Sequence, residues 1–214
     1  MAKRLRRDAD LAGRTAVEAS LSIVPYVGPR VVAAMHALEI RTISDRIEDF
    51  VEEFNELGAR LDQSKVDHEY LTSPEYVDSA IAALEAARRT SDRRKLRMIA
   101  AFLLGAATVE RPADLDVETV LIAIRDLSPS MLWMAGRIQV LATNPGQSQR
   151  MYGRAIPPAV PDRDFVLNRL VAAGLISEAG SGRFQVFQGD YSPTETLTRT
   201  MHTMQAGGWT PDPG

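Results

Sequence analysis

The chain contains no cysteine among its 214 residues. This absence excludes disulfide bonds, thiol nucleophiles and cysteine-ligated zinc, and it fits a reducing compartment, so we expect a cytoplasmic protein. There are three histidines, which lie far apart in the sequence and show no metal-ligand spacing: His36, His68 and His202. The sequence therefore predicts neither a metal nor a cofactor.

Motifs for catalysis and for nucleotide binding are also missing. The glycine-rich stretch at residues 179–182 fits a hairpin turn and not the strand-to-helix loop that holds phosphates. Carboxylates recur four residues apart at Asp45/Asp49 and Glu52/Glu56, but they lack the histidines that metal sites in helical bundles use. No nucleophile elbow occurs. We therefore expect a protein that is not an enzyme.

No apolar run is long enough to cross a membrane. The most apolar segment, Leu21–Leu38, is interrupted by Pro25, Pro29 and Arg30, whereas a spanning helix needs about 20 apolar residues. Basic residues precede it, but no cleavage site for a signal peptide follows it. Peripheral membrane contact through Leu21–Leu38 stays open as an alternative. The net charge of −3 gives no overall attraction to nucleic acid or to anionic lipid.

What the sequence does contain is a regular apolar seam on an acidic helix. Apolar residues alternate spacings of three and four, which places them on one helix face: Ile40, Ile43, Ile47, Phe50, Phe54, Leu57 and Leu61. A helix running from Pro29 to Leu61 would be about 50 Å long. A seam this regular packs against another helix. We therefore predict a homo-oligomer, or a complex with another helical protein, formed through the seam.

Capping signals mark further helices along the chain. Helix starts are predicted at Thr72-Ser73, at Thr90-Ser91-Asp92, at Asp116 and at Ser128, because short polar side chains accept hydrogen bonds from the first backbone N–H groups. The basic cluster Arg88–Arg97 is interpreted as a joint between two helices, paired with the carboxylates of the seam helix. The alternative is a patch for nucleic acid or an acidic partner.

The C-terminal region changes pattern. We predict helices up to about residue 142, where Trp133 is interpreted as core. Another helix is predicted over Asp162–Gly174, with Phe165, Val166, Leu170 and Val171 facing inward. Two short strands, Leu175–Ser177 and Arg183–Phe187, should flank the glycine-rich turn. A last helix follows Thr194, and residues 207–214, with Trp209, are predicted to form a flexible tail.

The order helix, helix, helix, hairpin, helix over residues 115–206 resembles a winged-helix domain. The residues that carry this resemblance are 170–176, a helix end with glycine followed by Leu-Ile, and Tyr191-Ser-Pro-Thr194 before the last helix. The predicted fold class is therefore mainly α. It comprises an N-terminal helical bundle with a long amphipathic helix (1–112), followed by a winged-helix-like domain with a two-stranded β-hairpin (115–206).

Winged helices bind DNA in some families and proteins in others. The resemblance places Arg163, Asn168 and Arg169 on the recognition helix and Arg183 on the wing, where they could contact nucleic acid. Residues 115–214 carry eight arginines and nine acids, however, so the domain lacks the basic face that phosphate contacts require. Nucleic-acid binding is therefore the less favoured interpretation.

The layout of the whole chain is similar to bacterial and phage helical proteins, some of them grouped with abortive-infection proteins. This resemblance implies a setting in phage defence. The sequence thus predicts a non-enzymatic interaction or effector protein that acts by self-association or partner capture. The alternatives are a winged-helix DNA-binding regulator and a membrane-perturbing defence effector.

Overall fold

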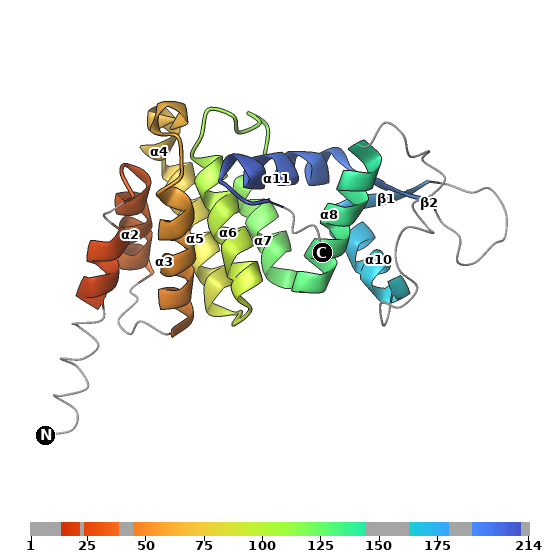
Figure 1. Ribbon diagram of the computed structural model, residues 1–214, viewed down its shortest axis with the longest axis horizontal. Coiled ribbons are helices and arrows are strands. Elements are labelled where there is room, and N and C mark those ends of the chain that lie inside the picture. The colour runs from red at the N-terminus through yellow and green to blue at the C-terminus, as the bar shows by residue number, and fades with distance from the viewer. Residues whose placement is uncertain (1–13, 22–23, 39–44, 144–162, 180–189, 211–214) are drawn as a thin grey trace, which may run out of the picture. The chain divides into compact units, whose positions relative to one another are not determined.

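The structure is a computed structural model that describes residues 14–21, 24–38, 45–143, 163–179 and 190–210 (Figure 1). These residues are mainly helical, and their strands form a single two-stranded antiparallel sheet, so the predicted fold class is confirmed. The chain divides into two compact units. Unit 1 comprises residues up to 125 together with 203–210, and unit 2 comprises residues 126–202.

Unit 1 is a bundle of helices. Residues 14–21 are helical, and they are followed by α2 (Val27–Ala37), α3 (Asp45–Gly58), η1 (Gln63–Lys65), α4 (His68–Leu71), α5 (Pro74–Arg88), α6 (Arg93–Ala106) and α7 (Val117–Asp126). α5 lies beside α6, α3 packs against both, and α2 packs on α5 (Figure 1).

The prediction of one helix from Pro29 to Leu61 is wrong. α2 ends at Ala37, where Leu38 N–H still donates to Ala34 O, and α3 begins at Asp45. The physical reason is that both segments must bury apolar side chains in one unit: α2 packs on α5, while α3 packs on α6. One straight helix about 50 Å long would be roughly twice as long as α5 (15 residues) and α6 (14 residues), so half of it would have no helix to pack against.

The seam becomes the core of unit 1. Ile47, Phe50, Phe54 and Leu57 are each at most 1% exposed, and the rings of Phe50 and Phe54 lie 5.9 Å apart. Their main neighbour is α6, whose residues from Met98 to Ala106 are all buried. These four seam side chains are therefore covered by helices of the same chain and leave no apolar surface for a second protein.

The three remaining seam residues, Ile40, Ile43 and Leu61, are not among these buried side chains. Ile40 and Ile43 lie outside the described residues. Leu61 follows the end of α3 and is half-buried.

The predicted helix starts are confirmed. Ser73 Oγ accepts from Tyr76 N–H at 3.3 Å, and Asp92 accepts from the backbone of the first turn of α6. Asp116 Oδ1 accepts from Thr119 N–H at 2.9 Å, and Ser128 Oγ accepts from Met131 N–H at 3.3 Å. These four caps satisfy N–H groups that have no partner inside their helices.

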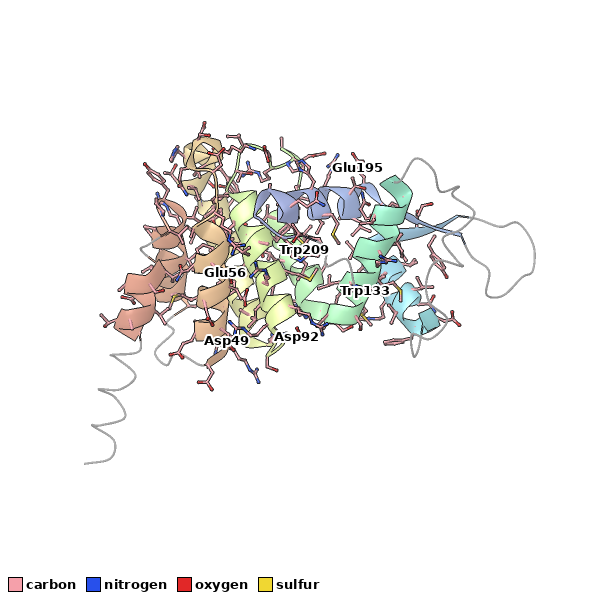
Figure 2. The ribbon with its side chains drawn as sticks, in the orientation of Figure 1. Asp49, Glu56, Asp92, Trp133, Glu195 and Trp209 are labelled. Carbon is pink, nitrogen blue, oxygen red and sulfur yellow. The ribbon has the colours of Figure 1, made fainter. Side chains whose placement is uncertain are left out.

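Residues 203–210 pack on α6 at backbone contact. A Cβ built on Gly105 would lie 1.7 Å from Thr203 O, and one built on Gly207 would lie 1.8 Å from Ala101 O. Only glycine permits this approach. Gly207 is consequently buried and Trp209 is half-buried (Figure 2 labels Trp209). Residues 207–210 therefore pack in unit 1, whereas the sequence predicted a flexible tail. Residues 211–214 lie outside the described part.

Unit 2 contains α8 (Pro129–Thr143), α10 (Arg163–Ala172), β1 (Ile176–Ala179), β2 (Asp190–Pro193) and most of α11 (Glu195–Ala206). α10 ends at Ala172, and Gly174, two residues later, has a φ of 69° that lets Leu175 N–H donate back to Leu170 O at 3.0 Å. β1 then pairs antiparallel with β2, with Ile176 opposite Pro193.

Thr194 links the end of α10 to the start of α11. Its hydroxyl lies 2.7 Å from Gly174 O and 2.9 Å from Leu175 O, so it can donate to these carbonyls. The same oxygen accepts from Leu197 N–H at 3.2 Å and so caps α11. Thr194, the last residue of the Tyr191-Ser-Pro-Thr194 segment noted in the sequence, thus contacts the backbone that follows α10 and caps α11.

Two boundaries differ from the sequence prediction. The strand that pairs with β1 is Asp190–Pro193, which the sequence analysis treated as the approach to the last helix, while the predicted strand at 183–187 lies outside the described residues. The division between units falls after Arg125 and not near Pro112, because α7 belongs to unit 1. There, buried Lys95 donates from Nζ to Arg125 O at 2.7 Å.

We expect Phe54→Ala to lower the free energy of unfolding by about 3–5 kcal/mol, because it empties a fully buried site between α3 and α6. Glu48→Ala, on the exposed side of the same helix, should cost less than about 0.5 kcal/mol. Urea denaturation measures both. Equal losses would contradict the assignment of the seam to the core.

We also expect Gly105→Ala to be destabilising. In an ordinary helix interior this change stabilises by about 0.5–1 kcal/mol, whereas here the new methyl group would overlap a backbone oxygen. The sign of the change in thermal midpoint is therefore decisive. A higher midpoint for the variant would show that residues 203–210 do not pack on α6 in this way.

Candidate functional site

The basic cluster at Arg88–Arg97 forms an ion-pair layer with α3. Arg97 Nη1 lies 2.8 Å from Glu53 Oε2 and 3.2 Å from Glu56 Oε2, and Arg93 Nε lies 3.3 Å from Glu53 Oε1 (Figure 2 labels Glu56). Glu53 is only 7% exposed, so its charge is compensated by two arginines where water is scarce. The interpretation of the cluster as a joint between helices is confirmed for these arginines.

The ionisation of this layer follows from its contacts. The hydrogen bond from Arg97, helped by its positive charge, holds the pKa of the Glu56 carboxyl below its ordinary value. Hydrogen bonds to Glu56 and then to Glu53 raise the pKa of Arg97. Glu56 and Arg97 therefore stay charged at neutral pH, and their ion pair helps to position α3 on α6.

The face of α10 predicted for nucleic acid is only partly basic. Asn168 and Arg169 are exposed, while the side chain of Arg163 and the whole of Arg183 lie outside what the structure describes. Phe165 on the same helix is 59% exposed, and Asp164 beside it is also exposed. A large apolar ring next to a carboxylate suits contact with a protein better than contact with phosphates.

A second exposed apolar face lies on α8. Trp133 is 39% exposed and Val140 is 40% exposed, and their spacing of seven residues puts them on one side of the helix (Figure 2 labels Trp133). Arg137 lies between them, with its guanidinium 5.8 Å from the centroid of the Trp133 ring. The prediction that Trp133 is a core residue is therefore wrong.

α8 and α10 together carry much of the exposed apolar surface. The two helices pack against each other in unit 2. Seven large hydrophobic side chains are exposed in the described part of the chain, and four of them belong to these helices: Trp133, Val140, Phe165 and Val171. The inward orientation predicted for this helix is confirmed for Val166 and Leu170, which are buried, and is wrong for Phe165 and Val171, which are exposed.

A groove between α5 and α7 was not foreseen from the sequence. It encloses about 230 Å³ and is lined by Asp78, Ile81, Ala82, Glu85, Glu118, Ile122 and Arg125. This volume is below the roughly 300–1,000 Å³ of small-molecule sites, so it suits a single side chain better than a cofactor. Across the described ranges, no three or more His, Asp or Glu side chains come together as metal ligands.

Most described apolar side chains of the segment considered for membrane contact lie in the core, while Tyr26 is 56% exposed. Leu21, Val24, Val27 and Val31 are each at most 1% exposed. Among the described helices, none combines the length and the apolar character that crossing a bilayer requires. Contact with lipid through these four side chains would therefore require unit 1 to open.

Comparison of the chain with protein-family models, with curated proteins and with solved structures found no match. The assignment of surfaces to functions therefore depends on the geometry and chemistry of this chain.

We expect the stabilisation that Arg97 provides to depend on pH. The folded-state pKa of Glu56 lies below its ordinary value of 4.5, so its ion pair stabilises the fold fully above that value. The contribution falls as the pH drops through the lowered pKa. Arg97→Met should therefore be destabilising at pH 7, and its difference from the unmodified protein should shrink toward pH 3.

Thermal unfolding across this pH range measures the difference. Arg89→Met, which alters an exposed arginine with no ion pair in the described residues, is the matched control and should show a small difference independent of pH. A difference for Arg97→Met that stays constant down to pH 3 would contradict the assigned ion pairs.

Proposed function

We propose that this chain is a non-enzymatic interaction protein that associates with a second copy of itself through α8 and α10 of unit 2. The observation that carries the proposal is the exposure of Trp133 and Phe165 on two helices that pack together. Tryptophan and other aromatic residues are enriched at protein interfaces, where they supply most of the binding energy. Contiguous exposed apolar surface on a protein marks interaction sites.

The charges on these helices favour a second copy. α8 exposes Arg137, and α10 exposes Asp164 and Arg169. In a two-fold contact the same surface meets itself, so a surface with both signs of charge can pair each cation with an anion of the other copy. A surface of one sign would repel its own copy. The predicted homo-oligomer is therefore kept, but its interface is moved from the seam to unit 2.

The interface is placed in unit 2 because the seam residues are buried in unit 1. The described seam residues of α3 are already covered by α6 of the same chain. Association through them would require exposing Phe50 and Phe54, at a cost of several kcal/mol. The helices of unit 2 offer apolar contact without that cost.

A DNA-binding regulator is the second candidate. Asn168 and Arg169 are exposed on α10, which is followed by the β1–β2 pair and by α11, in the order that the winged-helix resemblance implies. The exposed Phe165 and Asp164 on the same helix weigh against it. The setting in phage defence is supported only by the resemblance of layout.

The test is gel filtration with light scattering on the full chain at tens of micromolar. We expect a mass above that of one chain, and a monomer for the double variant Trp133→Ser/Phe165→Ser. Val109→Ser, which removes a 63% exposed apolar side chain of unit 1, is the control and should leave the mass unchanged. Circular dichroism checks that each variant is folded.

A monomeric unmodified protein would contradict self-association. The same samples mixed with duplex DNA at physiological salt distinguish the second candidate. A DNA complex that weakens in Arg169→Ala and at higher salt would make the regulator the better proposal.

A further inference from the structure

We propose that the groove between α5 and α7 binds an arginine-bearing basic segment of a protein partner. The groove belongs to unit 1 and is independent of the association proposed for unit 2. Its walls combine exposed carboxylates with an apolar centre, which matches both parts of an arginine side chain.

The arrangement of α5 gives the groove its shape. Asp78, Ile81, Ala82 and Glu85 follow one another on one helix face, and the seven steps from Asp78 to Glu85 give a rise of about 10 Å. A carboxylate therefore stands at each end of an apolar centre. From the opposite wall α7 contributes Ile122, which is 38% exposed although it is large and apolar.

The charge of the groove is unbalanced. Three carboxylates, from Asp78, Glu85 and Glu118, face one arginine, Arg125, which leaves a net charge of −2 (three negative, one positive). None of the three carboxylates joins an ion pair in the part of the chain that the structure describes. The carboxylates of α3, by contrast, are paired by arginines of α6.

An arginine side chain fits this combination better than other ligands do. Its alkyl stem can lie along Ile81 and Ile122, while its guanidinium donates to the carboxylates at the rim. Hydrogen bonds between two charged groups are stronger than neutral ones. The negative rim repels nucleic acid, and the volume of about 230 Å³ is small for a cofactor. A basic protein segment is therefore the occupant that the groove favours.

The test uses a labelled amphipathic peptide whose arginines are spaced three and four residues apart, measured by fluorescence anisotropy with the full chain. We expect saturable binding at low salt, and none for the same peptide with glutamates in place of the arginines. The triple variant Asp78→Asn/Glu85→Gln/Glu118→Gln should bind about tenfold more weakly or worse, because charge-assisted hydrogen bonds are lost.

Two further variants separate the groove from general attraction to an acidic protein. Ala82→Trp fills the groove and leaves every charge in place, so it should weaken binding as the triple variant does. Asp45→Asn/Glu48→Gln/Glu69→Gln removes three exposed carboxylates outside the groove and should leave binding unchanged. Thermal unfolding checks that all variants are folded.

The proposal is overturned by any of three results: no binding to the unmodified protein, unchanged binding to Ala82→Trp, or equal losses in the two triple variants. The variant Trp133→Ser/Phe165→Ser should bind the peptide normally. A failure of self-association would therefore leave this result intact, and a failure of peptide binding would leave the oligomer intact.

Discussion

The burial of α6 is the constraint on which the rest of unit 1 depends. From Lys95 on, almost every residue of this helix is covered, yet the helix begins with basic residues. Its neighbours must therefore supply apolar side chains along its length and carboxylates at its start. α3 supplies both, with Phe50 and Phe54 on one face and Glu53 at the edge of that face.

The ion pairs and the aromatic core of α3 have different consequences. Burial of the two phenylalanines supplies free energy, because apolar area leaves water. The pairs made by Glu53 offset its desolvation and add little net stability, but a rotated α3 would leave that carboxylate buried without Arg93 and Arg97. The apolar contact therefore holds α3 on α6, and the charges select its rotation.

Local features of the fold could be predicted from the sequence, whereas features set by distant segments could not. The caps at Ser73, Asp92 and Asp116 depend on neighbouring residues, and they were found. The break after Ala37 was missed because the apolar periodicity continues across it. In the candidate surfaces, the pairing of the arginine cluster was predicted from charge. The exposure of Trp133 was not predicted, because apolar residues surround it in the sequence. The available signal was Arg137, which follows four residues later and therefore lies on the same helix face.

Residues 203–210 complete unit 1 only after all of unit 2 has been synthesised. The contact between Gly105 and Thr203 joins positions about a hundred residues apart, and such distant contacts form late and slowly in folding. A nascent chain that has emerged only to Arg125 therefore displays the uncovered side of α6 around Ala101. Premature termination anywhere within unit 2 would leave unit 1 open as well, so a truncated product would be a substrate for chaperones and proteases and not a working half of the protein.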